Sequence, residues 1–224
     1  MVVRALIFDV DGTLAETEEI HRAAFERAFA EDGLPWRWDV DLYRELLRVT
    51  GGKERIRHHL AMEGVGPALD EARIARLHAR KNEIYGEIVR SGGCALRPGV
   101  ADLVRAAREA GLRLAISTTT SRPNVDALLA ATFAGEEGLF DPIVAGEDVA
   151  AKKPAPDAYL LAIEKLGLPA EACLVFEDSR NGLTAARAAG LATIVTPSLY
   201  TAHESFEGAA AILPDLTAFD LAAW

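Results

Sequence analysis

The sequence is poor in cysteine, in cations and in long apolar runs, and each shortage argues against a class of protein. Two cysteines, Cys94 and Cys173, are too few for a disulfide framework and lack the spacing of a metal site, so we expect reduced thiols. Acidic residues number 34 against 24 lysines and arginines, and the formal net charge of −10 disfavours binding to nucleic acid or to an anionic membrane. Apolar runs are much shorter than a bilayer span and no signal-like segment opens the sequence, so we expect a cytoplasmic protein.

The composition that is present is that of a folded globular protein. Hydrophobic residues make up 50% of the chain and charged residues 26%, which argues against disorder. A length of 224 residues suffices for one large domain, or for a core domain with a smaller partner. We therefore look for the point at which the pattern of secondary structure changes.

The first motif is an apolar run that ends in two acids. Residues 5–8 predict a buried central strand, and Asp9, Asp11 and Gly12 follow it at once. Acids at the end of a buried strand are costly unless a metal, hydrogen-bond donors or a substrate compensate them. Taken alone, the motif is also compatible with an ordinary strand-end turn, because Asp and Gly are common turn residues.

A block without any strand pattern follows the first strand. Its expected helices are 17–30, 39–48, 53–63 and 70–90. Four helices inserted after strand one are foreign to a plain doubly wound sheet, so we expect a helical-bundle cap domain over residues 15–91. The core domain would then consist of residues 1–14 and 92–224.

Strands and helices alternate in the rest of the chain. We expect strands at 112–117, 142–145, 172–176 and 191–195, and helices at 97–111, 123–134, 156–166 and 181–189. Short loops between alternating elements indicate a parallel sheet with helices on both faces. The fold class is therefore α/β, a Rossmann-like parallel sheet with an inserted helical cap.

Three later strand ends carry polar residues that could meet the two acids. Residues 118–121 form a hydroxyl-rich turn, Lys153 precedes a helix, and Glu177 and Asp178 end a second apolar run. A simple helix cap would also explain the hydroxyls, and a solvated side chain would explain the lysine. Taken together, these groups form an oxygen-rich site that suits Mg2+, with a hydroxyl and an ammonium for a phosphate.

These four motifs resemble those of the haloacid dehalogenase superfamily of phosphohydrolases. The resemblance covers the whole chain, including the cap. The matching residues are Asp9-Val10-Asp11-Gly12-Thr13, Thr118, Lys153 and Glu177-Asp178. The resemblance implies that Asp9 attacks phosphorus to form an aspartyl phosphate, and that Asp11 is the general acid and base. It also implies that Thr118 and Lys153 bind the transferring phosphoryl group. The implied Mg2+ ligands are Asp9, the backbone carbonyl of Asp11, Glu177 and Asp178. True dehalogenases of this fold lack the second acid and are disfavoured.

The helical block resembles the cap of the β-phosphoglucomutase and phosphoglycolate phosphatase branch. This resemblance, with the motifs above, gives a set of expected substrate-binding residues: Glu16, His21, Thr50, Gly51, Gly52, Lys53, Lys81, Thr118, Thr119, Asn124 and Lys153. A packing role is an equal alternative for His21. For Arg55 and Arg80 we expect only a charged helix surface.

Three segments further resemble the CbbY subgroup: residues 49–56, residues 116–125, and residues 196–201 with 206–209 after them. Members of that subgroup hydrolyse xylulose-1,5-bisphosphate, an inhibitory by-product of Rubisco. The resemblance implies an Mg2+-dependent phosphatase that acts on this phosphosugar. We expect a monomer. A β-phosphoglucomutase or a phosphoglycolate phosphatase is the alternative, because these enzymes share the motifs. A non-catalytic sugar-phosphate sensor or a receiver domain is a weaker one.

Overall fold

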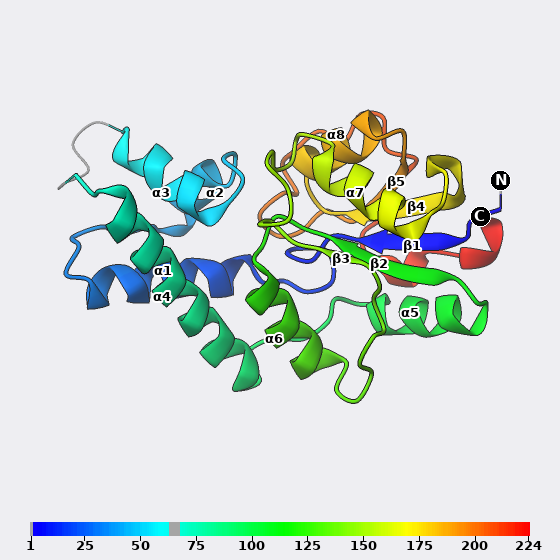
Figure 1. Ribbon diagram of the computed structural model, residues 1–224, viewed down its shortest axis with the longest axis horizontal. Helices are drawn as coiled ribbons and strands as arrows, with labels where there is room; N and C mark the ends of the chain where they lie inside the picture. Colours follow the sequence, from blue (N-terminus) through cyan, green and yellow to red (C-terminus); the bar gives the residue numbers. More distant parts are fainter. Residues whose placement is uncertain (1, 63–67) are drawn as a thin grey trace.

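A six-stranded parallel sheet forms the centre of the protein. The computed structural model describes residues 2–62 and 68–224. The strand order is β3-β2-β1-β4-β5-β6, so β1 lies inside the sheet (Figure 1). The strands are β1 (Ala5–Phe8), β2 (Arg113–Ser117), β3 (Ile143–Val144), β4 (Cys173–Glu177), β5 (Ala192–Val195) and β6 (Ala211–Ile212). Because β1 pairs in parallel with both β2 and β4, their carboxyl ends meet at one edge of the sheet.

Helices cover both faces of the sheet, as the alternating pattern predicts. They are α5 (Val100–Glu109), α6 (Arg122–Thr132), α7 (Asp157–Leu166) and α8 (Arg180–Ala188). Leu6 and Phe8 of β1 pack with residues of α5 and α6, whereas Ala5 and Ile7 pack with residues of α7 and α8. Successive side chains of a strand point to opposite faces, so this strand is apolar throughout and buried on both sides.

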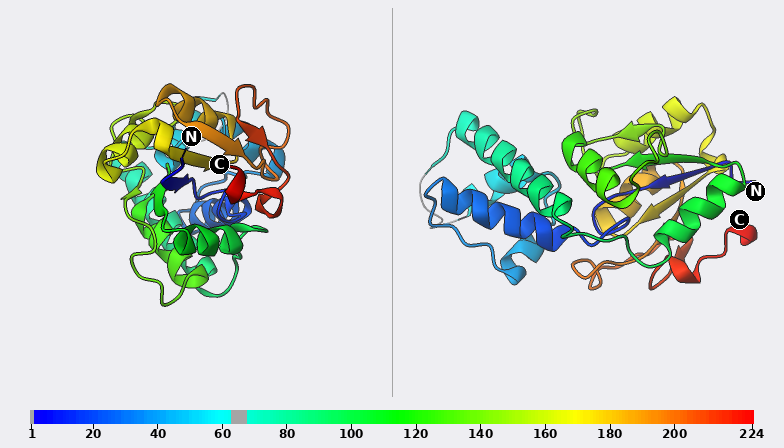
Figure 2. Two further views of the ribbon diagram at one scale, coloured as in Figure 1. Left: turned by 90° about the vertical axis from the view of Figure 1, so that its right-hand side faces the viewer. Right: turned by 90° about the horizontal axis from the view of Figure 1, so that it is seen from below.

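The helices between β1 and α5 lie beyond the carboxyl edge of the sheet (Figures 1 and 2). They are α1 (Glu18–Glu31), α2 (Val40–Leu46), α3 (Gly52–Leu60) and α4 (Glu71–Arg90). An aromatic cluster that includes Phe25, Phe29, Trp36, Trp38 and Tyr43 fills the space between them. Their hydrophobic core is therefore largely separate from that of the sheet.

The two connections between the helices and the sheet run side by side. Ala15, on the way to α1, forms a β-bridge with Leu96, which follows α4. The amide of Arg97 donates a hydrogen bond to the carbonyl of Leu14 over 2.8 Å. A pair of adjacent connections is the arrangement expected for an inserted segment.

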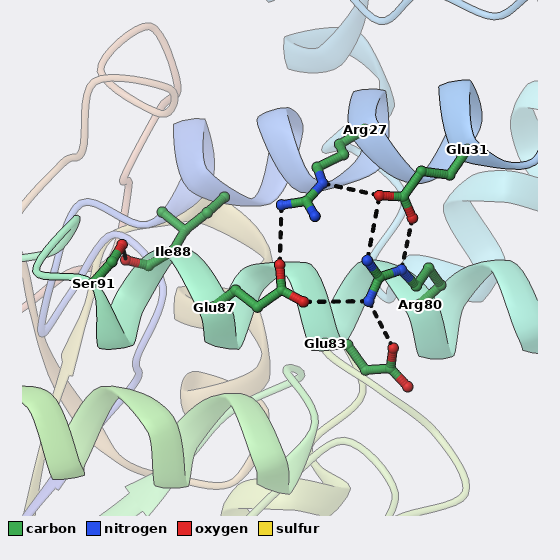
Figure 3. A network of polar contacts seen from close by, with 7 residues as sticks. All are labelled: Arg27, Glu31, Arg80, Glu83, Glu87, Ile88 and Ser91. Atoms are coloured by element: carbon green, nitrogen blue, oxygen red, sulfur yellow. Dashed lines mark hydrogen bonds and ion pairs between the residues drawn. The ribbon is translucent and has the colours of Figure 1, made fainter.

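An exposed ion-pair network joins α1 to α4 (Figure 3). Arg80 contacts Glu31 over 2.7 Å, Glu83 over 2.9 Å and Glu87 over 3.3 Å, and Arg27 contacts Glu31 and Glu87 over 3.0 Å each. Solvent and salt weaken such pairs, so they orient the two helices more than they stabilise them. Arg80 thus lies on a charged helix surface, as expected.

The predicted elements agree with the structure except at their ends and for a few short elements that were not expected. The expected end of the third helix, at residue 63, lies outside the described residues; α3 ends at Leu60. The two-residue strand β6 was not expected, and neither were the three short 3-10 helices at 170–172, 216–218 and 221–223. Such short elements carry no periodic pattern. None of the described helices is long and apolar enough to cross a membrane.

Asp70 caps the longest helix, and its removal tests how much α4 depends on that cap. Its carboxylate accepts a hydrogen bond of 2.7 Å from the amide of Arg73. Replacing an N-cap acid by alanine leaves a helix amide without a partner, so we expect Asp70→Ala to lower the free energy of unfolding by about 1 kcal/mol. Urea denaturation measures this change. Asp70→Asn keeps the acceptor and should stay close to wild type; an equal loss in both variants would contradict the capping role.

Candidate active site

A cavity of about 490 Å³ lies between the carboxyl edge of the sheet and the four helices. The sheet side contributes Asp9, Asp11, Lys153 and Asp178 to its wall. The helical side contributes a further set: His21, Thr50, Gly51, Gly52, Lys53, Arg55, His78 and Lys81. Acids therefore dominate one side of the cavity and basic groups the other.

Lys153 links the first and last motifs. Its ammonium donates hydrogen bonds to Asp9 Oδ1 over 2.7 Å, to Glu177 Oε1 over 2.6 Å and to the carbonyl of Ser117 over 2.8 Å. Burial alone would lower the pKa of Lys153, but the carboxylates of Asp9 and Glu177 outweigh it and raise that pKa to about 12. The lysine therefore stays charged, and its three donors are all used within the site.

Three buried carboxylates converge on this point. Ligand atoms of Asp9, Glu177 and Asp178 lie within 4.8 Å of one another. Burial raises the pKa of Asp9 to about 8, although Lys153 opposes the rise. Burial, and then the charges of Asp9 and Glu177, raise the pKa of Asp178 well above its usual range. One lysine cannot neutralise three acids, and hard oxygen donors are what Mg2+ prefers, so the residues present fit a divalent cation.

Asp11 heads a chain of hydrogen bonds that leads into the helices. Its carboxylate accepts a bond of 2.5 Å from the Thr17 hydroxyl and lies 2.9 Å from His21 Nε2. The other ring nitrogen of His21 lies 2.6 Å from the Lys81 ammonium, and the ring stacks on Tyr85. Burial alone would raise the pKa of Asp11, but His21 and Thr17 outweigh it and hold that pKa well below its usual range. Burial lowers the pKa of Lys81 to about 7.

The hydroxyl-rich turn after β2 divides between the interior and the cavity. Thr118 is only 1% exposed, and its hydroxyl accepts a hydrogen bond of 3.2 Å from the amide of Thr120. Thr119 and Asn124 lie on the cavity wall. Asn124 donates to the Thr120 hydroxyl over 3.0 Å, and to Asn82 of α4 over 3.3 Å. The turn thus connects the sheet to the helices at the rim of the cavity.

The glycine turn before α3 faces the same cavity. Gly51 has a φ of 95°, which favours glycine, and a Cβ there would lie 2.3 Å from Glu54 Oε2 and 2.7 Å from Lys152 Nζ. Lys152 forms an ion pair of 3.0 Å with Glu54 of α3. Lys53 also lines the cavity. Backbone amides at a helix N-terminus, with lysines beside them, suit an anion.

Glu16 is placed differently from the other expected binding residues. Its carboxylate lies 3.2 Å from the guanidinium of Arg97, in the paired connections between sheet and helices. The described residues of the cavity wall do not include it. Contact between Glu16 and a substrate therefore stays a prediction.

The expectation that Arg55 lies on a charged surface is wrong. Arg55 is 8% exposed and lines the cavity. Its guanidinium donates to the Tyr43 hydroxyl over 2.9 Å and to the carbonyl of Leu46 over 3.3 Å. The turn between α2 and α3 folds this helix face inward, which sequence spacing alone does not show.

Sequence reasoning also missed His78 and Gly182. His78 lies on α4 against Gly52, and burial, together with the charges of Lys81 and Lys53, lowers its pKa to about 3. Gly182 lies in the first turn of α8, and a Cβ there would lie within 2.0 Å of the Glu177 carboxylate. The three-residue spacing between His78 and Lys81 is a signal that both face one side of α4. Gly182 carried no comparable signal.

Comparison with known proteins agrees with the geometry. A model of haloacid dehalogenase-like hydrolases matches residues 3–190. Protein CbbY of Rhodobacter capsulatus is 57% identical over 219 residues, which cover 97% of this chain and 96% of that protein. A crystal structure of CbbY from Rhodobacter sphaeroides with phosphate shares 50% identity and a TM-score of 0.93, over 97% of this chain and 96% of that one. A mutant of the same protein, in complex with xylulose-(1,5)-bisphosphate, aligns equally well. The chain therefore belongs to the haloacid dehalogenase-like hydrolases and, among them, is of the CbbY type.

Proposed function

We propose that this protein hydrolyses xylulose-1,5-bisphosphate to xylulose 5-phosphate and inorganic phosphate, with Mg2+ as cofactor. The observation that carries the proposal is the division of one cavity into an acidic sheet side and a basic helical side. A sugar with two phosphates can place one on each side. A relative that shares half of its residues with this chain was crystallised with that same bisphosphate.

The sheet side carries out the chemistry. Asp9 attacks the phosphorus and carries the phosphoryl group as an aspartyl phosphate, and water then releases it. Lys153, with donors from the turn at Thr118 and Thr119, binds the transferring oxygens. Asp9, Glu177, Asp178 and the backbone carbonyl of Asp11 would hold Mg2+, which offsets the charge between carboxylate and phosphate.

Asp11 is the general acid and base of this proposal. Its contacts with His21 and Thr17 keep the carboxylate ionised, which suits the removal of a proton from water. Protonation of the leaving oxygen in the first step requires a proton on the same carboxylate. The continuous contact from Lys81 through His21 to Asp11 supplies a route for it.

The helical side holds the second phosphate. We infer that residues 15–91 form a cap domain whose α3 N-terminus, from Thr50 to Lys53, binds this phosphate together with Lys81. Support comes from the Gly51 turn, from the basic groups on that wall and from the separate core of the four helices. A closed cavity would exclude bulk water from the phosphoryl group.

The first test measures phosphate release from xylulose-1,5-bisphosphate, ribulose-1,5-bisphosphate, 2-phosphoglycolate and β-glucose-1-phosphate. We expect strong release from the xylulose compound in Mg2+ and nearly none in EDTA, because removal of the cation leaves the buried acids uncompensated. Asp9→Asn lacks the nucleophile and serves as the blank. Preference for 2-phosphoglycolate, or interconversion of glucose phosphates without phosphate release, would contradict the proposed substrate.

A second test separates the two sides of the cavity. Lys53→Met removes a cation from the helical side, so we expect the KM for xylulose-1,5-bisphosphate to rise about tenfold, the loss of one charge-assisted hydrogen bond. The KM for the monophosphate β-glucose-1-phosphate should change little. Arg57→Met is the matched control, because Arg57 lies on the same helix but pairs with Glu71 over 2.6 Å outside the cavity wall. Equal losses for bisphosphate and monophosphate would argue against a distal phosphate site at α3.

A third test addresses the close packing around Glu177. Gly182→Ala places a methyl group within 2.0 Å of the Glu177 carboxylate and must displace it, so we expect kcat to fall by about 100-fold. Gly86→Ala is the control, since its Cβ meets only the flexible end of Arg90 inside α4. Steady-state kinetics and melting temperatures of both variants make the comparison. An active Gly182→Ala enzyme would show that the position of Glu177 is not critical.

A further inference from the structure

Tyr159 touches both members of the buried Lys153–Glu177 pair. It lies on α7 and is 0% exposed, behind the cavity. Its hydroxyl donates a hydrogen bond of 2.6 Å to Glu177 Oε1, the same oxygen that accepts from Lys153. The Lys153 ammonium also lies 4.8 Å from the centre of the tyrosine ring, within range of a cation–π contact. One side chain thus contacts the cation with its ring and the anion with its hydroxyl.

Both oxygens of the Glu177 carboxylate accept hydrogen bonds from described residues. Oε1 accepts from Lys153 and Tyr159, while Oε2 accepts from the amide of Asp178 over 3.2 Å and from the Ser179 hydroxyl over 3.4 Å. Gly182 leaves just enough room for the group. A buried carboxylate needs donors for its lone pairs, and of the four donors here only the Tyr159 hydroxyl comes from outside the motifs and their adjoining residues.

We propose that Tyr159 is a positioning residue, which fixes the Glu177 carboxylate and through it aims the Lys153 ammonium at Asp9. Without the hydroxyl, Oε1 would keep a single donor, and the carboxylate would turn toward the lysine and draw the ammonium away from Asp9. The ligand atom that Glu177 offers to a cation would turn with it.

This inference rests on the proposed function for its cation but not for its substrate. Tyr159 stands behind the cavity, so it should influence turnover and cation affinity while leaving the binding of the sugar nearly unchanged. A residue that merely fills space would lower stability without altering either quantity. Measurements of turnover, cation affinity and stability therefore distinguish a positioning role of Tyr159 from simple packing.

The test compares Tyr159→Phe with Tyr85→Phe. Both variants lose one buried hydroxyl, but the Tyr85 hydroxyl has no hydrogen-bond partner among the described residues. Calorimetry with Mg2+ alone should show an affinity about tenfold weaker for Tyr159→Phe, the usual effect of losing an outer partner of a metal ligand, and no change for Tyr85→Phe. Kinetics of Tyr159→Phe should show kcat about tenfold lower, with KM within about twofold of wild type.

A double-mutant cycle shows whether Tyr159 acts through Glu177. If it does, Tyr159→Phe should cause little further loss of Mg2+ affinity in a Glu177→Gln background. A lower melting temperature with unchanged Mg2+ affinity, or additive losses in the cycle, would overturn the inference. Should the wild-type enzyme release no phosphate from any sugar phosphate, the proposed function would fail, while the calorimetric comparison would still decide the role of Tyr159.

Discussion

The site depends on one electrostatic constraint: three buried carboxylates lie close together beside a single ammonium. Asp9, Glu177 and Asp178 lie within reach of one cation, and Lys153 binds the first two directly. Burying unpaired charge is expensive, so this cluster persists only where the fold forces it and a bound cation can offset it.

The parallel sheet is what forces these acids together. Phe8 of β1 lies opposite Phe176 of β4, so Asp9 and Glu177 follow at the same level. Close approach also requires residues without side chains. A Cβ on Gly12 would lie 2.2 Å from the Asp178 carboxylate, and the φ of 81° at that position favours glycine as well. The site therefore requires glycine at position 12 as well as the acids themselves.

Residues at strand ends were predictable from the sequence, whereas residues that depend on helix packing were not. Asp9 and Asp178 each follow an apolar run, and parallel strands bring such ends together by rule. Arg55 looked like a surface residue because its helix is polar, and only the packing of α3 on its neighbours buries it. Tyr159 matched an apolar position of α7, and nothing local indicates that its hydroxyl meets Glu177, 18 positions further along.

The ion pair of Glu16 also could not be predicted from the sequence. Contact between Glu16 and a substrate stays a prediction, and in the structure its carboxylate pairs with Arg97, which lies far along the chain. Arg97 also donates to the carbonyl of Pro197 over 2.9 Å. Glu16 lies in the first connection between sheet and helices, whereas Arg97 lies in the second. The spacing of residues within the first connection therefore cannot reveal this ion pair.

Contacts across the cavity explain how two separate cores can act as one site. Lys152 pairs with Glu54, and the hydroxyl of Tyr200 donates to Glu19 over 2.5 Å, so the sheet side binds α3 and α1 at different points of the rim. These contacts are polar and partly exposed, which makes them weaker than either hydrophobic core. A ligand with an anion at each end would add attraction across the same gap, because it meets cations on both walls. In the proposed reaction, this arrangement would link recognition of a second phosphate to the exclusion of water from the first.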